Sequence, residues 1–154
     1  MNSLSLKEKG FTEFVSLKGL PFSSLPQNKG VVFAIVDTAL SGKPTSDILY
    51  IGRSKRPAKR IFGGYLAGYG GKATRKINSK LMDEGYIEKV LVSWMVNDNP
   101  KVAQQELLET FKKEHGQYPS WNDSKKVFEK PQPKIRAVKV RSRRKQAKSV
   151  KPTS

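Results

Sequence analysis

Three residues of the types that break phosphodiester bonds stand along this chain: Tyr50, Arg60 and Glu106. Hydrolysis needs a base for the attacking water, positive charge on the phosphate and stabilisation of the leaving oxygen. Nearby cations favour a Tyr50 phenolate that could act as the base, and the Arg60 guanidinium fits phosphate oxygens. Glu106 could bind a metal ion. Each also has an ordinary explanation, as a core tyrosine, a backbone-binding cation and part of a solvated helix face.

The helical spacing around Glu106 favours it over Glu109 as the metal ligand. Ala103, Leu107 and Phe111 recur every four residues, which predicts a helix with one apolar face. On that helix Glu106 lies about 60° from Ala103. Glu109 lies about 200° from Leu107 and from Phe111. We therefore expect Glu106 to border the packed face and Glu109 to point outward.

Any metal ion here is expected on oxygen ligands. The chain has no cysteine and one histidine, His115, which excludes thiolate zinc sites and histidine clusters. Oxygen ligands suit Mg²⁺ or Mn²⁺, the usual ions of phosphoryl chemistry. His115 is expected to end a helix, where a protonated imidazole is favourable. ATPases and zinc peptidases are excluded, because the chain has neither a GxxxxGK[ST] loop nor an HExxH helix.

The charge of the chain favours a polyanionic partner. Thirty Lys and Arg against 13 Asp and Glu give a net charge of +17, and nucleic acid is the first candidate for such a chain. The stretch from Ile48 to Met82 contains no acidic residue. Cations expected to contact nucleic acid are Arg53, Lys55, Arg56, Lys59, Lys72, Arg75 and Lys76. Tyr65 and Tyr69 could stack on bases. Asn122 is either a nucleic-acid contact or a hydrogen-bonding residue of the chain end.

Membrane and secreted classes fit the sequence poorly. No stretch approaches the roughly 18 apolar residues of a spanning helix, and the opening MNSLSLKEKG lacks the apolar run of a secretory signal. We expect a protein of the cytoplasm or nucleoid, not secreted and without a membrane partner. A membrane-surface protein is the remaining alternative for a basic chain, although no helix combines a basic face with a broad apolar face.

The predicted fold class is α+β, with a small central, mainly antiparallel three-stranded sheet flanked by helices. Strands are expected near 31–36, 47–52 and 89–96, which are β-branched or aromatic runs bounded by turn residues. Helices are expected over 58–62, 74–83 and 100–115, with a glycine-rich irregular loop over 63–72.

Three parts of the chain are distinguished by composition. Residues 1–29 are expected to form an extension that packs on the domain, with a short helix or turn suggested by the spacing of Phe11, Phe14, Leu17 and Leu20. Residues 30–130 are the expected domain. Residues 131–154 carry nine Lys and Arg and no acid, which predicts a disordered basic tail.

The two strands around Tyr50 resemble a known nuclease signature. Gly30-Val31-Val32, followed roughly twenty residues later by Tyr50-Ile51-Gly52, resembles the two-strand motif of the GIY-YIG nuclease superfamily, which includes the N-terminal domain of UvrC repair nucleases and intron-encoded homing endonucleases. Arg60 stands where that family has a catalytic arginine on a short helix. Arg53 matches a position that is often basic.

The resemblance continues to the end of the expected domain and covers roughly residues 30–122. Glu106, leading to Phe111, resembles the metal-binding glutamate of the family's helix, and Pro119 to Asn122 resembles its closing Pro-x-x-Asn element. The chain departs from the family at Val32, where a tyrosine usually ends the first motif. It departs again at Gly64, one helical turn after the arginine, where the family often has histidine or tyrosine, although Tyr65 is adjacent.

The resemblance implies a metal-dependent endonuclease with Tyr50, Arg60 and Glu106 as catalytic residues and Glu106 as the ligand of Mg²⁺ or Mn²⁺. We expect DNA rather than RNA as the substrate. A non-catalytic nucleic-acid-binding module of the same fold, ribosome-associated or architectural, is the alternative. Val32 and the basic tail favour it.

Overall fold

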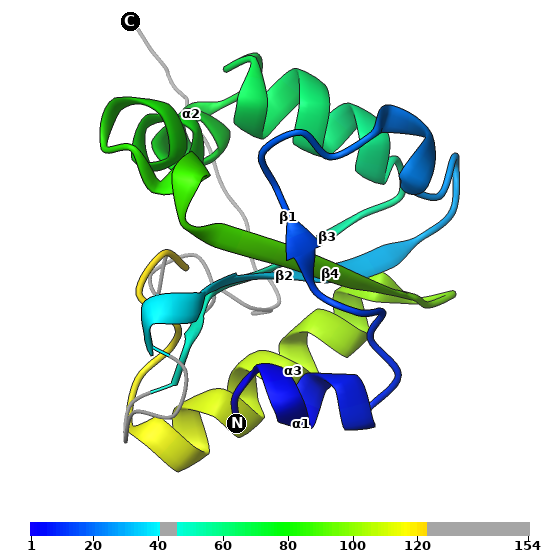
Figure 1. The fold of residues 1–154 in the computed structure, drawn as a ribbon. Coiled ribbons are helices and arrows are strands. Elements are labelled where there is room, and N and C mark those ends of the chain that lie inside the picture. Colours follow the sequence, from blue (N-terminus) through cyan, green and yellow to red (C-terminus); the bar gives the residue numbers. More distant parts are fainter. Residues whose placement is uncertain (41–45, 123–154) are drawn as a thin grey trace, which may run out of the picture. The chain divides into compact units, whose positions relative to one another are not determined.

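A four-stranded antiparallel sheet forms the centre of the protein (Figure 1). The computed structural model describes residues 1–40 and 46–122, so the expected basic tail and part of the loop after the first long strand lie outside the described residues. The strands are β1 (Val15–Ser16), β2 (Val31–Asp37), β3 (Ile48–Ser54) and β4 (Val90–Val96), in the order β1-β4-β2-β3. The α+β class and the three strands expected from the sequence are confirmed.

The short edge strand β1 is the fourth strand, which the sequence did not predict. Both of its residues are exposed, so it has no apolar alternation by which a strand is recognised. Backbone pairing holds it in place, with Val15 opposite Val92 of β4. Its flanking residues Phe11 and Leu17 are buried. Residues 11–16 are therefore extended and not helical, whereas a turn follows from Leu17 to Leu20, where Leu20 N donates to Leu17 O at 3.2 Å.

The helical segments are α1 (Ser3–Glu8), η1 (Phe22–Ser24), η2 (Thr38–Leu40), η3 (Lys59–Leu66), α2 (Lys72–Asn78), η4 (Ser79–Asp83), η5 (Tyr86–Glu88) and α3 (Pro100–His115). Asn99 caps α3 by accepting a hydrogen bond from Val102 N, and Pro100 follows it at the first helical position. His115 is the last residue of α3, as expected. The helix expected over 74–83 is the continuous pair α2 and η4.

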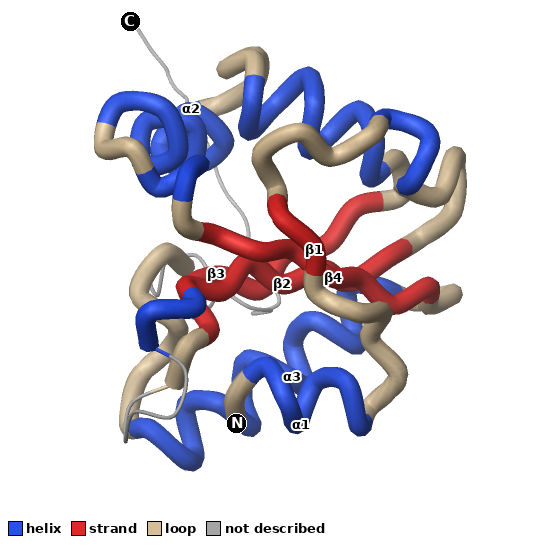
Figure 2. The backbone as a smooth tube through the Cα atoms, viewed as in Figure 1, coloured by secondary structure: helices blue, strands red, loops and turns tan. Residues whose placement is uncertain are grey.

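Strand β2 is buried along its whole length because helices cover both faces of the sheet. Its seven residues VVFAIVD are all buried, which explains why the run is continuously apolar. Phe33 belongs to a core that also contains Ile61 of η3 and Ile77 of α2. The alternate side chains of β2 point to the face that carries α1 and α3, and Figure 2 shows these two helices together on one side of the sheet.

The helix after β3 continues further than the sequence predicts. Segment η3 is a π-helix that runs to Leu66, so the first part of the glycine-rich stretch is helical and not an irregular loop. Gly64 permits this arrangement, because a Cβ there would lie 3.0 Å from Cγ2 of Thr74 in α2. Gly68 and Gly70, both with positive φ, form the loop that remains between η3 and α2.

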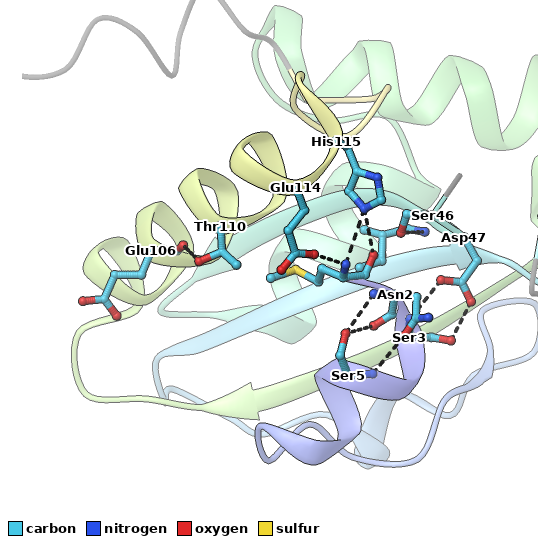
Figure 3. Close-up of polar contacts among 11 residues, drawn as sticks. Asn2, Ser3, Ser5, Ser46, Asp47, Glu106, Thr110, Glu114 and His115 are labelled. Carbon is cyan, nitrogen blue, oxygen red and sulfur yellow. Dashed lines mark hydrogen bonds and ion pairs between the residues drawn. The ribbon is translucent and has the colours of Figure 1, made fainter. Parts of the chain in front are cut away.

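A buried carboxylate fastens the N-terminal helix to the sheet. Asp47, just before β3, accepts hydrogen bonds from Ser3 N at 2.8 Å and from Ser3 Oγ at 2.5 Å (Figure 3). Asn2 caps the same helix by accepting a hydrogen bond from Ser5 N. Residues 1–29 therefore pack into the same compact unit as the sheet, and this unit spans Met1–Asn122.

The outer edge of β3 is covered by the segment that follows α3. Ile51 N donates to Asn122 Oδ1 at 3.0 Å, and Asn122 Nδ2 donates to Ile51 O at 3.0 Å. Trp121 N also donates to Leu49 O at 2.9 Å. An uncovered edge strand would leave these backbone groups open to pairing with another chain. Asn122 thus uses both ends of its amide to protect the strand that carries Tyr50.

We expect Asn122→Ala to lower the free energy of unfolding by about 1–3 kcal/mol, because it removes two partners from a half-buried strand edge. Denaturant unfolding measures this loss, and the exposed Gln117→Ala is the matched control. If both variants are equally stable, Asn122 does not hold the edge of β3.

Candidate active site and nucleic-acid interface

Two tyrosine hydroxyls meet on the face of the sheet that η3 covers. Tyr50 lies opposite Ile35 of β2, and its Oη is 3.1 Å from Tyr65 Oη. The ring of Phe33 packs against both, with centroid distances of 6.0 Å to Tyr50 and 5.8 Å to Tyr65. Tyr65 is only 3% exposed, whereas Tyr50 is half-buried. Tyr50 is therefore the tyrosine of the pair that a substrate could reach.

The π-helical form of η3 brings Tyr65 to this pair. In a π-helix each N–H bonds to the carbonyl five residues earlier, so residues five apart lie one turn from each other. Tyr65 stands five residues after Arg60. Gly64 and Tyr65 thus both lie about one turn after the arginine, and a Cβ at Gly64 would lie 3.9 Å from Cδ of Arg60.

Thr74 of α2 holds Arg60 beside the tyrosine pair. Arg60 Nη1 donates to Thr74 Oγ1 at 3.0 Å, and Thr74 is buried while Arg60 is exposed. Among the described residues Arg60 has no carboxylate partner, so its charge remains available to an anion. Sequence reasoning missed Thr74. The glycines at 64 and 70 were the only hint in the sequence that another side chain packs closely there. A Cβ at either position would lie 3.0 Å from the Thr74 side chain.

Burial keeps Tyr65 in its neutral form. Burial raises the pKa of the Tyr65 hydroxyl well above its ordinary value, and the charge and hydrogen bond of Tyr50 raise it further. The charge of Arg60 acts in the opposite direction. A neutral Tyr65 can donate its hydrogen to Tyr50 Oη.

Helix α3 brings Gln104, and not Glu106, to strand β3. Gln104 Nε2 donates to Ile51 O at 3.0 Å, and Gln104 Oε1 accepts from Arg53 Nε at 2.9 Å. Glu106 is exposed, and no hydrogen bond or ion pair joins its carboxylate to another described residue. Figure 3 shows that side chain pointing away from the other labelled residues. The charge of Arg60 thus acts on Tyr65, the hydrogen-bonding partner of Tyr50, and Glu106 contacts none of these three residues.

Glu109 also differs from the simple expectation of a solvated residue. It is exposed, as predicted, but its Oε2 accepts a hydrogen bond from the Tyr118 hydroxyl at 2.8 Å. Its role in the fold is therefore to fix the segment after α3.

The residues present at this centre do not form a ready metal site. Within the described part of the chain, no group of three or more His, Cys, Asp or Glu gathers in one place. Where α3 meets β3, the side chain is the neutral amide of Gln104. Its oxygen already accepts from Arg53, whose charge would repel a cation. The expectation that Glu106 holds Mg²⁺ or Mn²⁺ stays a prediction.

The cations expected to contact nucleic acid are all exposed. They occupy the turn after β3 (Lys55 and Arg56), η3 (Lys59) and α2 (Lys72, Arg75 and Lys76). None has an acidic partner among the described residues. Arg53 differs from the other cations because its side chain lies on the α3 side of the sheet. It lies opposite Val32 and donates a hydrogen bond to Gln104 of α3. The cations other than Arg53 are therefore open to a polyanion on the η3 and α2 side.

Two of the other expected contacts are engaged inside the fold. Tyr65 has no open ring face to stack on a base, because it is packed against Phe33 and Tyr50. The amide of Asn122 is bound to Ile51. The structure therefore does not support a direct nucleic-acid contact by Tyr65 or Asn122. Tyr69 is 79% exposed and keeps the expected ability to stack.

Comparisons with known proteins do not assign the chain to a family. No family model, no curated protein and no solved structure matches it. None of the helices in the described ranges is long and apolar enough to cross a membrane. The likeness to GIY-YIG nucleases therefore rests on the sequence motifs alone and stays a prediction.

We expect Tyr65 and Tyr118 to ionise later than ordinary tyrosines in an alkaline titration followed by phenolate absorbance. Burial and the Glu109 carboxylate raise the pKa of Tyr118 from 10.0 to about 12. A raised folded-state pKa contributes stability below pH 10 that is lost as pH rises through the folded-state value. Glu109→Gln should lower the pKa of Tyr118. Ionisation of all five tyrosines in one step near pH 10 would contradict this.

Proposed function

We propose that the protein is an endonuclease that cuts the phosphodiester backbone of nucleic acid, DNA rather than RNA, at the centre formed by Tyr50, Tyr65 and Arg60. The contact between the two tyrosine hydroxyls, 3.1 Å apart, beside an unpaired arginine carries the proposal. The two tyrosine hydroxyls already satisfy each other, so their stability does not require the exposed Arg60 beside them. The surrounding cations without acidic partners support nucleic acid as the substrate.

The chemistry assigned to each residue follows from its position. Arg60 binds a non-bridging phosphate oxygen and offsets the negative charge that grows at the phosphorus. Tyr65 donates its hydrogen to Tyr50 Oη, and Tyr50 as the phenolate accepts a proton from the attacking water. The water oxygen forms the new bond to phosphorus while the ester P–O bond breaks, and solvent protonates the leaving oxygen. A bound Mg²⁺ or Mn²⁺ would supply further positive charge.

A non-catalytic nucleic-acid-binding module remains the second candidate, and two observations favour it. Gln104 presents an amide where α3 meets β3. Val32 is fully buried and lies opposite Arg53, on the side of the sheet away from Tyr50. The aromatic residue of β2 that packs against Tyr50 is instead Phe33, which has no hydroxyl to position water.

Arg60→Ala should lower cleavage by about a hundredfold or more, because it removes charge stabilisation that is strongest in the transition state. Binding should weaken only slightly, since one cation among 30 is a small part of a diffuse attraction. Single-turnover cleavage and binding titrations measure the two effects separately. The matched control is Lys113→Ala, an exposed cation of α3.

Tyr50→Phe should reduce cleavage to a similar degree with little change in binding. It also leaves the buried Tyr65 hydroxyl without a partner, which costs about 1–3 kcal/mol of stability, so cleavage is measured well below the melting temperature. Equal loss of binding and cleavage in both Arg60→Ala and Tyr50→Phe would show that these residues bind the substrate and take no part in the chemical step.

The metal requirement is tested on α3. We expect Glu106→Gln to abolish cleavage that depends on Mg²⁺ or Mn²⁺ and to leave the fold intact, since that carboxylate makes no contact in the described structure. Glu109→Gln should cleave like the wild type and serves as the control. Gln104→Glu places a carboxylate beside Arg53, and tighter Mn²⁺ binding by this variant than by the wild type would show that position 104 lies within reach of the metal. Full activity of Glu106→Gln would remove Glu106 from the site.

A further inference from the structure

A cavity between the N-terminal segment and η3 combines aromatic, amide and basic side chains. Its volume is about 430 Å³, within the range of about 300–1,000 Å³ found for small-molecule sites. The N-terminal segment lines it with Phe22, Gln27 and Asn28, and the region from the end of β3 into η3 lines it with Arg56 and Phe62. Lys59 of η3, the neighbour of Arg60 in the chain, also lines it. The cavity is therefore next to the proposed centre along η3.

The aromatic part of the cavity is an open platform. Phe22 is 56% exposed, and its ring contacts that of Phe62 with a centroid distance of 5.2 Å and an interplanar angle of 48°. An exposed phenylalanine fixed by a second ring can stack on a nucleobase, and every base offers a flat face for this. The rings are thus suited to a planar ligand.

The basic part of the cavity is not neutralised by the protein. Arg56 and Lys59 are exposed and have no acidic partner among the described residues. None of the described residues that line the cavity is acidic. Two cations at the rim of an aromatic platform fit a ligand that carries both a planar ring and a negative charge.

The amide part of the cavity supplies hydrogen-bonding groups. Asn28 has a φ of +56°, in the left-handed region, and is the one non-glycine residue with positive φ in the described structure. Its side chain makes no hydrogen bond to another described residue, and Gln27 Nε2 makes one long bond of 3.3 Å to Leu25 O. Amides of this kind can bond to the edge of a base.

We propose that this cavity binds one unpaired nucleotide of the nucleic-acid substrate. The base stacks on Phe22 and Phe62, Gln27 and Asn28 bond to its edge, and Arg56 and Lys59 hold the adjoining phosphate. A fully paired duplex cannot supply such a base without flipping it out. The inference rests on the proposed function and deepens it, because it makes substrates with unpaired nucleotides, such as single strands and branches, the preferred class.

The test uses the full-length protein and a fluorescently labelled single-stranded DNA oligonucleotide, with a blunt duplex of the same sequence as the comparison. Phe22→Ala should weaken binding of the single strand by about tenfold, from the loss of one stacking contact, and leave duplex binding unchanged. Phe22→Trp should restore single-strand binding. The control is Leu4→Ala, which removes another exposed apolar side chain on α1. Arg56→Gln should lower the salt slope of log K by about 0.7, whereas Phe22→Ala should not alter it.

The outcomes separate this proposal from the proposed function. If Phe22→Ala binds the single strand as tightly as Leu4→Ala does, while the wild type binds and cleaves DNA, only the nucleotide cavity is overturned. If the wild type binds neither DNA, both ideas fail. Weak single-strand binding by Phe22→Ala that Phe22→Trp restores supports the cavity, whether or not the protein cleaves.

Discussion

The burial of one hydroxyl determines how the centre of this protein is built. Tyr65 of η3 packs against Phe33 in the core, where an unpaired polar group is costly. The hydroxyl of Tyr50 supplies its partner. This pairing requires β3 to present Tyr50 to the same face as η3 and requires η3 to have π-helical spacing. Gly64, Thr74 and the close approach of α2 then follow from that packing and bring Arg60 to the same place.

The distribution of charge is the second organising feature. Three described acids, Glu13, Glu88 and Glu84, form ion pairs with Lys7 of α1, Lys18 of the N-terminal segment and Lys80 of η4, and Glu109 accepts a hydrogen bond from Tyr118 after α3. The cations around η3 and α2 have no such partners. Positive charge without acidic partners around the tyrosine pair supports a site for phosphate. The cavity at Phe22 lies beside these cations and supports a site for a base.

Much of the fold could be predicted from the sequence, because long β-branched runs and an amphipathic helix have strong periodic signals. Strand β1 could not, since two exposed residues held by backbone bonds leave no pattern. The catalytic roles of Tyr50 and Arg60 stay predictions, and Tyr65, which was assigned to base stacking, instead lies buried with its hydroxyl against that of Tyr50. Gln104 was missed because its contact depends on the tilt of α3 against β3, and helical phase alone does not give that tilt.

The central claim is that the Tyr50–Tyr65–Arg60 centre cuts nucleic acid. It is tested most directly by incubating the pure wild-type protein with plasmid DNA, branched DNA and structured RNA, with Mg²⁺, with Mn²⁺ and with chelator, and separating the products by size. Our account predicts cleavage of DNA, strongest on the branched form with its unpaired nucleotides. Tight binding to all three substrates with no cleavage under any condition would contradict it and leave the binding module in its place.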